Sequence, residues 1–128
     1  MTILAGLSAI LVEDEVLIAL DAEEMLRELG AADVTVATTF DDAMRLIGER
    51  RFDVALLDVT LHGQKSFPLA ERLAGRNTAV VFGTGYNHIA HEFGGGEAVG
   101  CVTKPYTVDS LRKELTALLA ARSADTPA

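Results

Sequence analysis

The sequence lacks several features that would assign it to a particular class of protein. Its single cysteine, Cys101, cannot form an internal disulfide, so we expect a reducing, cytoplasmic setting. No apolar run is long enough to span a bilayer, and the first residues, MTILAGLSAI, lack the positively charged start of a secretory signal. We therefore expect neither a disulfide-stabilised secreted scaffold nor a membrane protein.

Basic residues are also scarce. Eleven Lys and Arg stand against 19 Asp and Glu, which gives a formal net charge of −8. A nucleic-acid-binding surface needs clustered Lys and Arg to neutralise phosphates, so we expect no nucleic-acid partner. A protein partner is compatible with this charge. With 128 residues, no internal repeat and no linker, the chain has the length of one domain.

Short apolar runs alternate with amphipathic stretches along the chain. The runs typical of buried strands lie at residues 8–12, 33–37, 54–58, 78–83 and 98–102. The residues with helical spacing are Ile18, Ala22, Met25 and Leu29, then Ala43, Leu46 and Ile47, then Leu69 and Leu73, and last Leu111, Leu115 and Leu118. Between the last two strands, the glycines at 94–96 favour only a short or irregular helix. This alternation predicts an α/β fold, a doubly wound parallel sheet with helices on both faces.

Polar residues follow the apolar runs at one predicted place, the carboxyl end of each strand. These residues are Glu13 and Asp14, Asp58, Thr84 and Lys104. Each of them alone has an ordinary explanation as a turn, cap or loop residue. Ligands of open parallel sheets bind at this edge, however, so the joint placement of these residues favours a functional site.

The residue types indicate phosphoryl chemistry. Three carboxylates close together need a compensating cation, and an oxygen-rich site with few protein ligands suits Mg²⁺. A carboxylate such as Asp58 can be the nucleophile in phosphoryl transfer, which gives an aspartyl phosphate. Lys104 and a hydroxyl such as that of Thr84 would then stabilise the charge on the transferring group.

With these five positions in order on the expected elements, residues 7–121 resemble the receiver domains of bacterial two-component response regulators. The resemblance implies a flavodoxin-like sheet of five strands in the order 2-1-3-4-5, and we expect residues 122–128 to form a disordered tail. It implies that Asp58 is the phosphoacceptor, that Asp14, Asp58 and the backbone carbonyl of Thr60 bind Mg²⁺, and that Glu13 acts through water. Lys104 and Thr84 would hold the phosphoryl oxygens.

The same resemblance implies a stand-alone signalling protein rather than an enzyme in the usual sense. A histidine kinase would supply the phosphoryl group, and a downstream protein target or a phosphotransfer protein would receive the signal. It leaves a weak homodimer open. No output domain is expected after the last helix, where only SADTPA follows.

Two positions and one stretch depart from the common receiver pattern. Cys101 stands where most receivers carry the aromatic residue that reports phosphorylation, and His62 stands where most carry a proline. The stretch AVVFGTGY resembles the Phe-Ala-Thr-Gly-Tyr-type signature of single-domain alphaproteobacterial receivers, which are linked to general-stress signalling. Because Cys101 is no aromatic, we predict a switch in which phosphorylation pulls Thr84 toward Asp58 and repositions the loop that carries Tyr86, the nearest replacement for the missing ring. The alternative is that Tyr86 only packs over the site and limits the access of water to the acyl phosphate.

Two rival interpretations stay open at this point. A flavodoxin-like cofactor carrier would share the strand order, but its phosphate-binding loop would here be Glu13-Asp14-Glu15, which repels a phosphate. A receiver-like interaction module that is never phosphorylated is the second rival, because the usual switch positions are altered.

Overall fold

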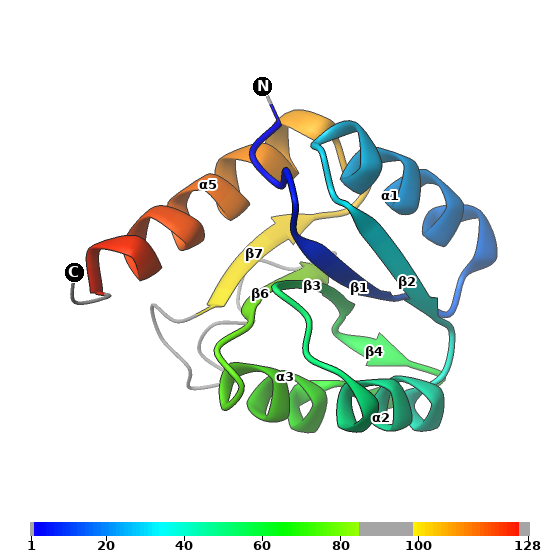
Figure 1. The fold of residues 1–128 in the computed structure, drawn as a ribbon. Helices are drawn as coiled ribbons and strands as arrows, with labels where there is room; N and C mark the ends of the chain where they lie inside the picture. The colour runs from blue at the N-terminus through cyan, green and yellow to red at the C-terminus, as the bar shows by residue number, and fades with distance from the viewer. Residues whose placement is uncertain (1, 85–98, 126–128) are drawn as a thin grey trace.

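A five-stranded parallel sheet forms the centre of the protein, as the computed structural model shows for residues 2–84 and 99–125, with side chains described up to residue 121 (Figure 1). Its strands are β1 (Ser8–Val12), β2 (Asp33–Ala37), β3 (Val54–Asp58), β6 (Ala79–Thr84) and β7 (Val99–Thr103). They lie in the order β2-β1-β3-β6-β7. This is the predicted order 2-1-3-4-5 of the main sheet, and the last two strands each end one residue later than predicted.

The described helices cover the two faces of this sheet in pairs. They are α1 (Val16–Glu28), α2 (Phe40–Glu49), α3 (Phe67–Ala74) and α5 (Val108–Asp125). Buried residues of α1 and α5 pack on one face in a single apolar cluster, and those of α2 and α3 pack on the other (Figure 1). The expected doubly wound α/β fold is therefore confirmed.

The helix ends follow from local chemistry that the sequence makes visible. Thr39 precedes α2, and its hydroxyl accepts a hydrogen bond from the backbone N–H of Asp42 at 3.1 Å. Thr107 precedes α5, where its hydroxyl accepts from Ser110 N–H at 3.0 Å while the Ser110 hydroxyl accepts from Thr107 N–H at 3.2 Å. Gly30, just after α1, has a φ of 107°, which glycine adopts without the strain of a side chain. These residues fix where α2 and α5 begin and where α1 ends.

A short hairpin after β3 was not predicted. It pairs β4 (Thr60–Leu61) with β5 (Gln64–Lys65) in an antiparallel way. The turn is made by His62 and Gly63, with φ angles of 48° and 81°. Positive φ at both central positions is the conformation of the tight hairpin turn, and glycine at the second one is a usual sign of it. The hairpin holds the backbone of Thr60 and His62 next to the carboxyl ends of β1 and β3.

The ends of the chain differ from the predicted boundaries. Helix α5 runs to Asp125, past residue 122 where we placed the start of the tail. Leu4 lies before the predicted start of the domain at residue 7, yet it is fully buried and its N–H donates to Leu29 O. The predicted fourth helix, Tyr86 and the glycines at 94–96 lie outside the described residues.

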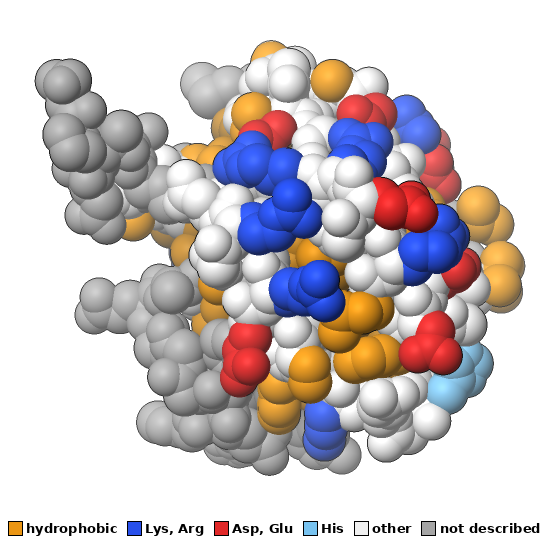
Figure 2. Space-filling model, turned by 60° about the horizontal axis from the view of Figure 1, so that its bottom comes forward, with side chains coloured by type: hydrophobic (Ala, Val, Ile, Leu, Met, Phe, Trp, Pro, Cys, Tyr) orange, Lys and Arg blue, Asp and Glu red, His pale blue; other side chains and the backbone are white. Residues whose placement is uncertain are grey.

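The face that carries α2 and α3 gathers several Lys and Arg side chains around an apolar patch (Figure 2). Three arginines in α2 or just after it pair with carboxylates of the protein itself. Arg45 pairs with Asp42 and Glu49, Arg50 with Asp33, and Arg51 with Asp53, all within 3.4 Å. Exposed pairs of this kind contribute little to stability. Among the described residues, no helix has both the length and the apolar composition needed to cross a membrane.

Candidate functional site

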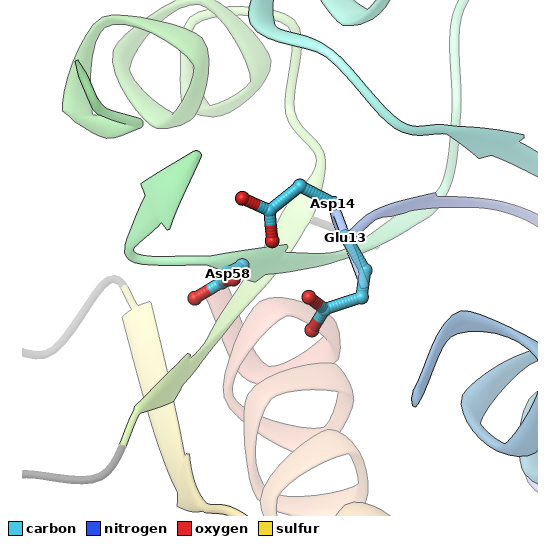
Figure 3. Close-up of side chains that lie close together, drawn as sticks. All are labelled: Glu13, Asp14 and Asp58. Atoms are coloured by element: carbon cyan, nitrogen blue, oxygen red, sulfur yellow. The ribbon is translucent and has the colours of Figure 1, made fainter. Parts of the chain in front are cut away.

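The sequence-predicted acids come together at the carboxyl edge of the sheet. Strands β1 and β3 are neighbours, with Val12 paired to Leu57, so the residues that follow Val12 lie beside Asp58. One carboxylate oxygen from each of Glu13, Asp14 and Asp58 lies within 4.8 Å of the other two. Figure 3 shows the three carboxylate groups coming from the ends of β1 and β3 and facing a common space. Their proximity was predicted from the strand ends alone.

Glu13 is the most deeply placed of the three, with no exposed surface. Burial raises the pKa of Glu13, and Lys104 and the backbone N–H of Glu15 oppose this shift. That N–H donates to Glu13 Oε2 at 3.1 Å. The other oxygen, Oε1, accepts no well-aligned hydrogen bond from the described residues. The ammonium of Lys104 lies beside it and acts as its counter-ion.

Lys104 supplies the positive charge of the site. It follows β7 directly, and its Nζ lies 2.8 Å from Glu13 Oε1 and 3.2 Å from Asp58 Oδ2. Burial by itself would lower the pKa of Lys104, but the neighbouring carboxylates of Glu13 and Asp58 raise it above its usual value. The lysine therefore stays charged and bridges two acids that would otherwise repel each other.

Asp14 is held by the hairpin on the opposite side of the site. The backbone N–H of His62 donates to Asp14 Oδ2 at 2.8 Å, and His62 Nδ1 lies 3.8 Å from the same oxygen. Partial burial by itself would raise the pKa of Asp14, but the hydrogen bond from the His62 backbone and other local bonds lower it overall. Asp14 is thus kept ionised, and the residue at position 62 acts here through its main chain.

Asp58 is the last residue of β3, and a hydrogen bond from a neighbouring side chain holds its backbone. The hydroxyl of the buried Ser66, just before α3, donates to the carbonyl oxygen of Asp58 at 2.6 Å. The backbone N–H of Thr60 lies 3.4 Å from Asp58 Oδ1. Ser66 is the N-cap residue of α3, but its side chain makes no capping hydrogen bond. It reaches the backbone of the central acid, which places Ser66 among the residues that support the site.

The predicted switch residues are only partly described. Thr84 ends β6 and is 5% exposed, and its carbonyl accepts from Lys104 N–H at 2.9 Å. Cys101, in β7, is half-buried, and its N–H donates to Glu114 Oε1 at 3.1 Å. Burial, together with the charge of Glu114, raises the pKa of the Cys101 thiol. The role of Tyr86 stays a prediction.

One residue of this region was missed. Tyr106 comes two residues after Lys104, is 6% exposed, and lies with its ring centroid 6.0 Å from Lys104 Nζ. A tyrosine next to a proline is a common loop residue, so its position alone gave no reason to expect burial. The available signal was the glycine at position 83, which ends the run of larger apolar side chains in β6.

The donor set of the site fits a Mg²⁺ ion. Three carboxylates within 4.8 Å of one another offer the hard oxygen ligands that Mg²⁺ prefers, and the low pKa of Asp14 keeps one of them charged. Among the described residues, Lys104 is the one Lys or Arg that pairs with these three carboxylates, so a further cation would be attracted to this space. The residues that would hold it are Glu13, Asp14 and Asp58.

Comparison with known proteins agrees with this geometry. The sequence model of the response regulator receiver domain matches residues 9–116, whereas a search of curated proteins gives no match. The solution structure of SdrG from Sphingomonas melonis Fr1 is similar, with 34% identity over 93% of this chain and 99% of that chain and a TM-score of 0.71. The BeF3-activated conformation of SdrG is 36% identical over 90% and 98% of the two chains, with a TM-score of 0.72. The anti-anti-sigma factor PhyR from Bartonella quintana, 22% identical over 96% of this chain and 52% of that one, shares the fold at a TM-score of 0.81.

Proposed function

Because the chain belongs to the family of response regulator receiver domains, we propose that it is a stand-alone response regulator that accepts a phosphoryl group on Asp58. The donor would be the phosphohistidine of a histidine kinase, and the output would be contact with another protein. The observation that carries this proposal is the cluster of Glu13, Asp14 and Asp58, with oxygens within 4.8 Å and Lys104 beside it. The match over 99% of the SdrG chain supports action as a single domain.

In the proposed transfer, an oxygen of Asp58 forms a bond to phosphorus while the bond from phosphorus to the histidine nitrogen breaks. Asp58 is held for this attack by Ser66, which bonds its main chain, and by the strand pairing of β3. Lys104, now 3.2 Å from Asp58 Oδ2, would move onto a phosphoryl oxygen. The hydroxyl of Thr84 would donate to another phosphoryl oxygen.

Glu13, Asp14, Asp58 and the backbone carbonyl of Thr60 would hold Mg²⁺. When bound, this ion would neutralise the carboxylates and the charge on the transferring oxygens. The protein's own part is to keep Asp14 ionised and to hold the three acids close together. It does so through the His62 N–H on Asp14 and the Lys104 ammonium between Glu13 and Asp58.

A protein donor needs a docking surface next to this edge, and α1 offers one. Val16, Leu17 and Leu20 are the exposed large apolar side chains of the described residues, at 64%, 78% and 56%. They lie on the helix that begins two residues after Asp14. Exposed apolar side chains gathered in this way favour a protein contact.

Phosphorylation by the small donor acetyl phosphate tests the chemistry without a kinase. We expect the intact mass of the wild-type protein to rise by one phosphoryl group when Mg²⁺ is present, and not when it is chelated. Asp58→Asn should show no increase. A wild-type protein that never gains a phosphoryl group would instead support the interaction module that works without phosphorylation.

A second variant separates docking from chemistry. Leu17→Glu changes an apolar side chain that is 78% exposed and is none of the residues assigned to the chemistry. It should accept phosphate from acetyl phosphate at the wild-type rate but from a phosphorylated histidine kinase more slowly. Equal rates from both donors would remove α1 from the proposed docking surface.

A further inference from the structure

Tyr106 carries a buried hydroxyl that the proposed chemistry leaves unexplained. Its side chain is 6% exposed, and the hydroxyl has no hydrogen-bond partner among the described residues. Buried polar groups of proteins are nearly always hydrogen-bonded, so an isolated phenol hydroxyl calls for a reason. A phenylalanine would fill the same space without this cost.

The hydroxyl lies in a notch made by Gly83. A β-carbon at position 83 would overlap with the hydroxyl and with ring atoms of Tyr106, so the glycine is required by this side chain. In the sheet, Gly83 is paired with Asp58 of β3 on one side and with Val102 of β7 on the other. The hydroxyl is therefore placed over the sheet in the row that contains Asp58.

Strand alternation puts this hydroxyl on the side of the sheet that Glu13 faces. Leu11, Leu56 and Val81 pack in the cluster under α1 and α5. Side chains two residues further along a strand point to the same face, which places Glu13, Asp58 and position 83 together. Burial, and then the charges of Glu13 and Asp58, raise the pKa of Tyr106, so the phenol keeps its proton and is a hydrogen-bond donor.

Glu13 is the group that would need this donor. Its Oε1 now has the ammonium of Lys104 at 2.8 Å as its counter-ion, and Lys104 also contacts Asp58. Under the proposed function, Lys104 turns to the phosphoryl group on Asp58. Even where Mg²⁺ neutralises the charge of Glu13, its fully buried Oε1 would then lose the ammonium, and a buried carboxylate oxygen without a partner is unfavourable unless another donor replaces it.

We propose that Tyr106 is a positioning residue whose hydroxyl donates a hydrogen bond to Glu13 in the phosphorylated state, replacing Lys104 there. Gly83 admits the hydroxyl to this position. The inference rests on the proposed phosphorylation of Asp58, because only that event draws Lys104 away. It explains why a tyrosine and a glycine occur together at these two positions.

The variant Tyr106→Phe tests the inference, because it keeps the ring and removes only the hydroxyl. Beryllofluoride with Mg²⁺ serves as the probe of the phosphorylated state, and its affinity is measured by titration. Since a hydrogen bond to a charged group is lost in the bound state alone, we expect about ten-fold weaker binding than in the wild type. The free variant should melt at the wild-type temperature or above it, because an unpaired hydroxyl has been removed.

A spectroscopic readout examines the same contact directly. The chain has two tyrosines and no tryptophan, so the Tyr86→Phe variant has Tyr106 as its only strong fluorophore. A hydrogen bond from the phenol to a carboxylate quenches tyrosine emission. We therefore expect the emission of this variant to fall when beryllofluoride and Mg²⁺ are added, and the additional change Glu13→Gln to reduce that fall.

The outcomes are distinct. Equal beryllofluoride affinity of Tyr106→Phe and wild type overturns the inference and leaves the proposed function intact. A variant that is less stable when free but binds with unchanged affinity also overturns it, since the hydroxyl would then be purely structural. If the wild type neither binds beryllofluoride nor accepts phosphate, both the function and the inference are wrong.

Discussion

Lys104→Met removes the only cation that the described structure places between Glu13 and Asp58. The methionine keeps most of the length and the apolar stem of lysine but leaves a fully buried glutamate beside a second carboxylate. Loss of one partner of a buried ion pair costs roughly 3 to 5 kcal/mol. Because the Lys104 side chain is 21% exposed, we expect the lower end, about 3 kcal/mol of unfolding free energy. For a domain of this size that corresponds to a fall in melting temperature of about 10 °C.

Thermal and urea unfolding at neutral pH, followed by circular dichroism, measure this loss. Arg45→Met is the matched control, since it also removes a cation from two carboxylates, but at a surface where Arg45 is 56% exposed. It should change the melting temperature very little. Adding Glu13→Gln to Lys104→Met removes the uncompensated charge and should recover at least half of the lost stability.

The pH dependence of Lys104→Met gives a second check on the same reasoning. Glu13 has a raised pKa in the folded protein, so its contribution to stability is fully present below its ordinary value of 4.5 and is lost as pH rises through the folded pKa. The deficit of the variant should therefore shrink as pH falls toward 4.5. A deficit no larger than that of Arg45→Met, or one independent of both pH and Glu13, would refute our account of the ion pair.

Three further predictions concern the support of the site and of the sheet. Ser66→Ala removes the 2.6 Å bond to the Asp58 carbonyl and should cost about 1 to 2 kcal/mol in urea unfolding, with slower phosphorylation by acetyl phosphate. Asp14→Asn should raise the Mg²⁺ concentration needed for half-maximal phosphorylation. The circular dichroism spectrum of the protein should stay unchanged, which shows that the fold is intact. Asp53 accepts from Ser8 N–H at 2.9 Å, and although burial alone would raise the pKa of Asp53, its hydrogen bonds and Arg51 lower it. Asp53→Asn should therefore lower the unfolding free energy by about 1 kcal/mol at neutral pH, and the difference should vanish as pH falls below the ordinary value of 3.8.

The sheet and the acid cluster could be predicted because both depend on simple patterns. Buried parallel strands are nearly continuous apolar runs, and a polar residue that ends such a run falls at the carboxyl edge. The sequence pattern alone therefore predicts that Glu13, Asp14 and Asp58 lie together. The match of the receiver family over residues 9–116 then confirmed the resemblance seen in the motifs.

The missed features depend on contacts between residues far apart in the chain. The burial of Tyr106 requires the empty volume at Gly83, and neither residue indicates this alone. Ser66 does stand at the N-cap of α3, but nothing local indicates that its hydroxyl donates to the carbonyl of Asp58, eight residues earlier. The hairpin at Thr60–Lys65 had a local sign in Gly63, which the apolar pattern of the neighbouring strand obscured.

The predicted switch at Thr84 and Tyr86 remains a hypothesis. Tyr86 lies outside the described residues, and Cys101 has the half-buried place of a packing residue. Tyr106 gives the site an aromatic residue on the face of the sheet under α1 and α5, whereas Cys101 packs against the apolar cluster of the opposite face. Partner binding after phosphorylation, compared between Tyr86→Ala and Tyr106→Phe, would show which of the two tyrosines takes part in the switch.

The most direct test of the central claim is to locate the phosphoryl group. Borohydride reduces an aspartyl phosphate to homoserine, so treating the phosphorylated protein and sequencing its peptides by mass spectrometry marks the acceptor. We predict homoserine at position 58, formed only when acetyl phosphate and Mg²⁺ were both present. Homoserine at Asp14 or at any other aspartate, or stable phosphate with no homoserine at all, would contradict the assignment of Asp58 as the phosphoacceptor.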